Sequence, residues 1–96
     1  MTQECSEHVD RICLTLVQSE IEVASSFVRL AEAEAQGGSM PHAIELLTRA
    51  ILAHKGVLKE LGAMSSDCQE EKSALWSEAR NLLESIQSVE RRLQIL

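Results

Sequence analysis

Aromatic side chains are almost missing from this 96-residue sequence, which has one phenylalanine, one tryptophan and no tyrosine. A hydrophobic core must therefore be built from Leu, Ile, Val and Ala, the residues typical of contacts between helices. Apolar residues never alternate with polar ones over five or six positions, so no β-strand is indicated. Proline occurs once and glycine four times, which leaves long uninterrupted segments that favour helices. The sequence predicts an all-α protein.

Basic residues are also few, with nine Lys and Arg against fifteen Asp and Glu and a formal net charge of −6. Nucleic-acid binding requires a basic stripe that neutralises phosphates, and this sequence offers only the pair Arg91–Arg92. No apolar run approaches the roughly 20 residues of a membrane span, and no polybasic segment suits a lipid surface. We therefore expect neither a nucleic-acid partner nor a membrane partner.

The three cysteines, Cys5, Cys13 and Cys68, follow no disulfide framework. Together with the lack of an apolar leader segment, they predict free thiols and a cytoplasmic location. Cys5 and His8 could share a helix face, but structural zinc needs four ligands and no further residues have suitable spacing. His54 is predicted to be a core or boundary histidine. We expect no cofactor, no metal and no catalytic group, and hence a protein that is not an enzyme.

The strongest break in the chain is Gly37–Gly38, followed closely by Pro41. Glycine ends one helix and proline begins the next. A second helix end is expected at Gly62, and Ser66 has the position of a capping residue for a third helix. Short connections make neighbouring helices antiparallel. The sequence thus predicts one domain, residues 1–96, folded as an antiparallel up-down-up three-helix bundle with long helices at about 6–36, 40–61 and 67–94.

Apolar residues in these helices recur at alternating spacings of four and three, as expected for helix–helix contacts. The third helix has one such stripe, interrupted by a lysine near its start: Cys68, Lys72, Leu75, Ala79, Leu82, Ile86, Val89, Leu93 and Leu96. The second helix has two adjacent stripes and is expected to contact both of the others. In the first helix, the predicted main stripe is Val9, Cys13, Leu16, Val23, Phe27, Leu30 and Glu34, interrupted by Glu20. A second stripe lies beside it: Val17, Ile21, Ala24, Val28 and Ala31.

The segment from Phe27 to Ile51 resembles a tetratricopeptide-type helical hairpin. After the turn glycine Gly38, the second helix matches the family pattern with Ala43, Ile44, Leu47, Ala50 and Ile51. Upstream, Phe27, Leu30 and Ala31 match the aromatic, leucine and small positions of the first helix. The chain departs from the family at Glu34, usually aromatic, and at Pro41 and His42, usually an acidic pair.

The three-helix layout of residues 24–93 is also similar to that of a microtubule-interacting-and-transport (MIT) type domain. That family carries an aromatic-x-x-Arg-Ala-Glu-like stretch in its third helix. The corresponding segment here is Leu75–Arg80, in which only the apolar and alanine positions agree. Both resemblances imply a helical module that functions through contacts with other proteins.

Four apolar residues are predicted to lie outside the helix–helix seams or at their margins and to contact a partner: Ile21, Val28, Leu52 and Trp76. Scattered surface apolar residues are normal, but an aligned set would form a contact for a partner. The acidic residues of the first helix, Glu20, Glu22, Glu32 and Glu34, are predicted to form a solvated face. The leading hypothesis is a non-enzymatic protein–protein interaction module that binds a partner helix in an inter-helical groove. The alternative is a structural homo-oligomer, a dimer in which long helices pair between chains.

Overall fold

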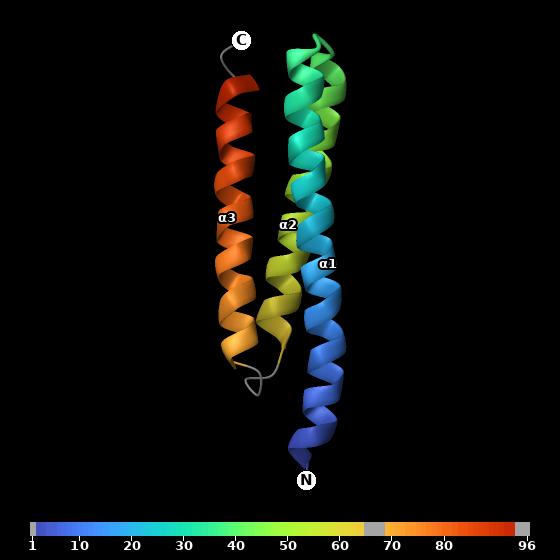
Figure 1. Ribbon diagram of the computed structural model, residues 1–96, viewed down its shortest axis with the longest axis vertical. Helices are drawn as coiled ribbons and strands as arrows, with labels where there is room; N and C mark the ends of the chain where they lie inside the picture. Colours follow the sequence, from blue (N-terminus) through green and yellow to red (C-terminus); the bar gives the residue numbers. More distant parts are fainter. Residues whose placement is uncertain (1, 65–68, 94–96) are drawn as a thin grey trace.

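The computed structural model describes residues 2–64 and 69–93, with side chains from residue 11 onward. It contains three helices: α1 (Thr2–Gln36), α2 (Met40–Ala63) and α3 (Gln69–Leu93). The helices run up, down and up, and α3 packs alongside the hairpin that α1 and α2 form (Figure 1). The described part of the chain has no β-strand. The predicted all-α, antiparallel up-down-up three-helix bundle is confirmed.

The turn between α1 and α2 lies at Gly37–Gly38, as predicted. Gly38 has a φ of 89°, the left-handed conformation in which a glycine ends a helix without a steric penalty. The amide of Ser39 donates a 2.8 Å hydrogen bond to the carbonyl oxygen of Glu34, which satisfies one of the last carbonyls of α1. Pro41 lies in the first turn of α2, where amides have no intrahelical partner and proline is tolerated.

The other helix ends differ from the prediction. Helix α2 continues through Gly62 to Ala63, and the helix ends where Met64 adopts extended angles of φ −70° and ψ 151°. Gly62 does not have a positive φ, so the expected left-handed stop at this glycine is wrong. The predicted capping residue Ser66 lies outside the described residues. Helix α1 begins earlier than expected, at Thr2, and its N-terminal turns project beyond the end of α2 (Figure 1).

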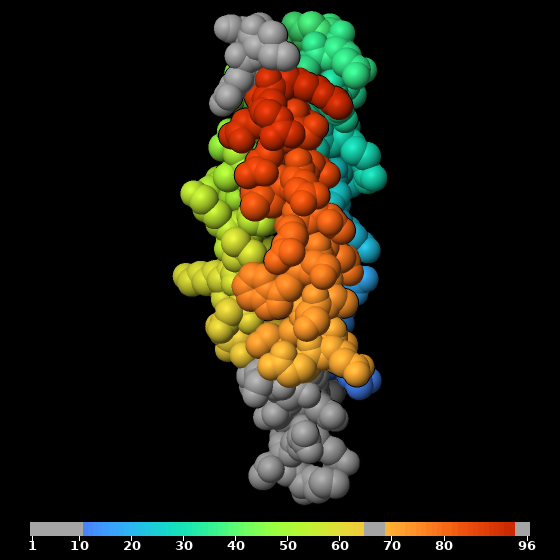
Figure 2. Space-filling model, turned by 90° about the vertical axis from the view of Figure 1, so that its left-hand side faces the viewer, coloured from blue at the N-terminus to red at the C-terminus, as the bar shows by residue number. Residues whose placement is uncertain are grey.

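All three helices contribute to one apolar core. Helix α3 buries the apolar residues of its predicted stripe that the structure describes: Leu75, Ala79, Leu82, Ile86, Val89 and Leu93. Lys72 is half-buried, and Cys68 and Leu96 lie outside the described residues. Helix α2 buries residues from both of its predicted stripes: Ala43, Leu47, Ala50, His54, Val57 and Leu61. Figure 2 shows α3 lying across the seam between α2 and α1. The most extensive packing is between α1 and α2.

The predicted main stripe of α1 is wrong. Leu16, Val23 and Leu30 are more than half exposed. The core side of α1 is instead the neighbouring stripe together with one further leucine: Leu14, Val17, Ile21, Ala24, Val28 and Ala31. Both stripes have the spacing of a helix contact, but the buried one carries alanines, which permit a close approach to α2. Steric fit therefore selects between two stripes of similar hydrophobicity.

Two leucines on α2 test this arrangement. Leu47 is buried and Leu52 is 61% exposed. We expect Leu47→Ala to lower the free energy of unfolding by about 2–4 kcal/mol, because a cavity remains beside the alanines. Leu52→Ala should cost less than about 1 kcal/mol. Chemical denaturation of both variants at low micromolar concentration measures the difference, and equal losses would contradict the burial of Leu47.

Candidate interaction surface

The four predicted surface residues divide into two pairs. Ile21 and Val28 are each only 5% exposed and belong to the core, so the expectation that they form a contact surface is wrong. They point inward because α1 is rotated to bring its alanines against α2. Leu52 and Trp76 are exposed, as expected, but they lie on different helices, α2 and α3. On the adjacent turns of α2, Leu52 has the exposed charged residues Arg49 and Lys55 beside it, which interrupt any continuous apolar surface.

A continuous uncharged surface does exist on α1, on the side opposite the core. We call it the outer stripe; it consists of Ile12, Leu16, Ser19, Val23, Ser26, Leu30 and Ala33. At 100° per residue, these positions face away from the buried side of the helix. The four large members are each at least half exposed. Their spacing is a strict alternation of four and three over three heptads, which is the pattern of a helix-pairing seam.

The outward faces of the other two helices differ from the outer stripe. On α2, the exposed outward residues include Glu45, Arg49, Lys55 and Lys59. On α3, they include Arg80, Glu84 and Arg91. Solvent-facing positions of a surface helix normally carry such charges. The outer stripe carries none, so α1 is the one described helix whose outward face has the composition of a contact surface.

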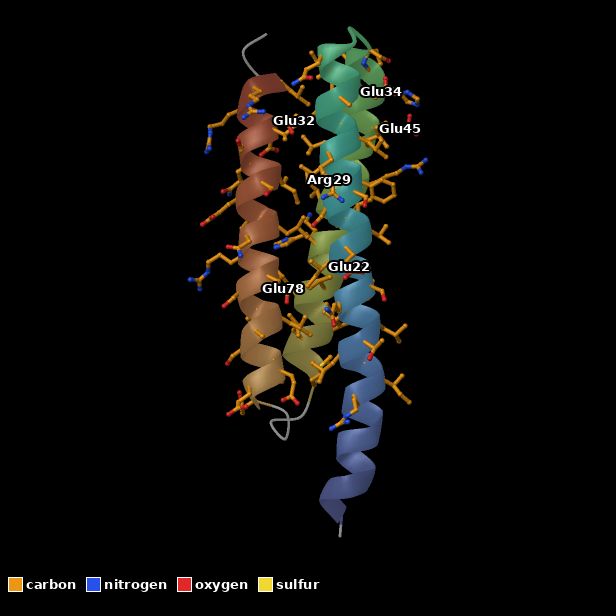
Figure 3. All side chains as sticks on the ribbon, in the orientation of Figure 1. Glu22, Arg29, Glu32, Glu34, Glu45 and Glu78 are labelled. Carbon is orange, nitrogen blue, oxygen red and sulfur yellow. The ribbon has the colours of Figure 1, made fainter. Side chains whose placement is uncertain are left out.

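Charged residues lie along both edges of the outer stripe. On the edge towards α3, Glu22 and Arg29 are one heptad apart and both exposed (Figure 3). The Arg29 guanidinium donates to the Ser26 hydroxyl at 3.4 Å, which holds it beside the stripe. On the edge towards α2 lie Glu20, half-buried, and Glu34, whose carboxylate is 3.7 Å from the His42 imidazole. The stripe is thus an apolar seam with a polar rim, the usual arrangement of a protein contact.

The groove between α1 and α3 is polar. Its volume is about 610 Å³, and it is lined by Ser25, Val28, Arg29, Glu32, Asn81, Glu84, Ser85, Ser88 and Val89. Glu32 forms an ion pair with Arg92 across this groove. The apolar side of an amphipathic helix would meet hydroxyl and charged groups there as well as apolar ones, and desolvation of those polar groups disfavours docking. The outer stripe suits such a partner better than this groove does.

A carboxyl pair joins α1 and α2. Glu20 of α1 lies near Glu60 of α2, and the pKa of Glu20 is raised, first by partial burial and then by a hydrogen bond with the Glu60 carboxyl group and by its charge. Gly56 lies beside the pair, and a Cβ built there would be 3.9 Å from Glu20 Oε2, an ordinary van der Waals contact. Two carboxyl groups bond in this way only while one holds a proton. The contact therefore favours packing of α1 on α2 at acidic pH and opposes it when both ionise.

The remaining candidates form no reactive centre within the described side chains. His54 is buried in α2, as predicted, and Cys13 is a half-buried free thiol. Among residues 11–64 and 69–93, no three His, Cys, Asp or Glu side chains are grouped so that they could hold a metal ion. The side chains of Cys5, His8 and Cys68 lie outside the described set.

Comparisons with known proteins give no relative: no family model, curated protein or solved structure matches this chain. The tetratricopeptide and MIT resemblances therefore stay predictions. Within the described helices, no segment has the length and apolarity required to cross a membrane.

Two valines on α1 provide a matched test of the outer stripe. Val28 is 5% exposed and Val23 is 52% exposed. We expect Val28→Ala to lower the free energy of unfolding by about 1–2.5 kcal/mol, through lost burial and a small cavity. Val23→Ala should change it by no more than about 0.5 kcal/mol. Urea denaturation at low micromolar concentration measures both, and a larger loss for Val23→Ala would contradict the orientation of α1.

The carboxyl pair predicts a pH-dependent effect of Glu20→Gln. Because the folded-state pKa of Glu20 is raised, its stabilising contribution is present below the unfolded pKa, about 4.3, and is lost as the pH rises through the folded value. At pH 7, Glu20→Gln should therefore raise the free energy of unfolding by about 0.2–0.5 kcal/mol, a small effect because solvent screens the pair. The gain should vanish below about pH 4. Thermal unfolding at several pH values tests this, with Glu84→Gln on α3 as the control of equal charge change.

Proposed function

We propose that this chain is a non-enzymatic helical interaction module, and that the outer stripe of α1 is its docking surface for a helix of another protein chain. The supporting observation is the exposure of Leu16, Val23 and Leu30 at heptad spacing on a face that has no charge. Apolar side chains aligned in this way lose contact with water when a second helix covers them. Isolated surface leucines, such as Leu52, lack this alignment.

The shape of the bundle supports the same proposal. Helix α1 has 35 residues, against 24 in α2 and 25 in α3. At 1.5 Å per residue, α1 is about 15 Å longer than either neighbour. Its N-terminal turns project beyond the hairpin (Figure 1), so a helix docked on the outer stripe could continue along them. A partner would thereby gain contact with parts of α1 that the bundle does not cover.

The homo-oligomer alternative uses the same surface. If the docked helix belongs to a second copy of the chain, the contact of the interaction module is also the contact of the dimer, and both hypotheses hold. The free thiol of Cys13 and the odd number of cysteines support a reducing, cytoplasmic setting for either form.

Photo-crosslinking tests the docking surface. We expect p-benzoylphenylalanine in place of Val23, on the outer stripe, to give a discrete protein adduct in the cells that make this chain. The same group in place of Glu84, an exposed residue of α3 at the groove between α1 and α3, should give none. The adduct should disappear when Leu30→Asp is combined with the photoreactive group, because a charge on the stripe must be desolvated on docking.

Circular dichroism of Leu30→Asp provides the folding control. Leu30 is 52% exposed, so the variant should retain its helix content and unfolding midpoint. Adducts of equal yield at positions 23 and 84, or an adduct that survives Leu30→Asp, would show that the outer stripe is not the docking surface.

A further inference from the structure

We infer that the occupant of the outer stripe is the outer stripe of a second copy of this chain, packed antiparallel across a two-fold axis. This inference rests on the docking surface proposed above and adds the identity, direction and register of the partner. It is carried by the order of large and small residues along the stripe and by the charges on its edges.

From Leu16 to Ala33, large and small residues alternate along the stripe. Leu16, Val23 and Leu30 repeat every seven residues, and so do the small residues Ser19, Ser26 and Ala33. In an antiparallel pair of such helices, each large residue of one copy can face a small residue of the other copy. With the two-fold axis between positions 24 and 25, three layers form and are repeated by symmetry: Leu16 faces Ala33 of the second copy, Val23 faces Ser26, and Leu30 faces Ser19. Every layer then pairs a large side chain with a small one, which fills space evenly and lets the helices approach closely.

The same register matches the edge charges. On the edge towards α3, Glu22 of each copy faces Arg29 of the other, which gives two symmetry-related ion pairs. On the edge towards α2, Glu20 faces Phe27 of the second copy and Glu34 faces Cys13. No two acidic residues of these edges oppose each other, although α1 carries most of its charge as carboxylates. Two-fold contacts are self-complementary in this way.

Other pairings of the stripe with itself fit less well. Moving the antiparallel register by one heptad places Glu22 opposite Glu22 of the second copy. A parallel pair places like residues opposite one another, so layers with two leucines alternate with layers with two serines, and the serine layers leave gaps. The antiparallel register with Glu22 opposite Arg29 is therefore the one that satisfies both packing and charge.

Charge reversal tests the register. We expect the reduced wild-type chain to shift from 10.6 kDa towards twice that mass as its concentration rises in sedimentation equilibrium at low ionic strength. Glu22→Arg alone leaves two arginines facing each other at both symmetry-related contacts, and Arg29→Glu alone leaves two glutamates there. Each variant should dimerise roughly tenfold more weakly, since two ion pairs become two repulsions. An equimolar mixture should regain dimerisation as a heterodimer, because both opposing pairs then have opposite charge.

The results separate this inference from the proposed function. Dimerisation that survives Leu30→Asp would overturn this inference, because the self-contact would lie elsewhere, whereas the proposed function is decided by the crosslink from position 23. A wild-type chain that stays at 10.6 kDa at several hundred micromolar would overturn the second copy as occupant, while the crosslink from position 23 still reports docking of another protein. Dimers that are lost in Leu30→Asp but unaffected by either charge reversal would overturn the antiparallel register. Glu84→Arg, with the same charge change on α3, is the control and should leave the dimer unchanged.

Discussion

The close packing of α1 on α2 determines how the rest of the bundle is arranged. Four alanines, Ala24 and Ala31 on α1 with Ala43 and Ala50 on α2, have no exposed surface, and these two helices pack more extensively than any other pair. Small residues let helix backbones approach, and the approach is lost if either helix rotates about its axis. The rotation of α1 is therefore fixed by its alanines. That rotation turns Ile21 and Val28 inward and the outer stripe towards solvent, with α3 across the seam on the other side.

Sequence patterns predicted the parts of the fold in which only one solution exists. The single apolar stripe of α3 gave its buried residues correctly, and Gly37–Gly38 with Pro41 gave the first turn correctly. Helix α1 has two stripes with the same spacing, and hydrophobicity alone favours the one with the larger side chains. The structure buries the other, because steric fit against α2 depends on residues far away in the sequence. Both misplaced surface residues, Ile21 and Val28, result from this one choice.

Three residues of the outer stripe, Leu16, Val23 and Leu30, belong to the main stripe that the sequence predicts for the core. Leu16, Val23 and Leu30 were recognised as a helix-pairing seam, and their spacing is indeed that of such a seam. What the sequence could not show is that α2 and α3 occupy a different side of α1. The informative signal is that the outward positions of α1 lack charges, whereas those of α2 and α3 have them. Helices α2 and α3 cover the core side of α1, and neither of them covers the outer stripe.

In the proposed dimer, folding and association use separate residues of α1. The core side chains lie on one side of the helix, and the outer stripe lies on the opposite side with few contacts to the rest of the bundle. Substitutions in the stripe can therefore alter association with little effect on folding, because the two sets do not share partners. In that dimer, the charged edges specify how the two helices are aligned. Apolar contacts tolerate a shift of one helix along the other by a heptad, whereas the pairing of Glu22 with Arg29 does not. Because both side chains are exposed, salt screens this selection, and ionic strength should affect the choice of register more than it affects burial of the stripe.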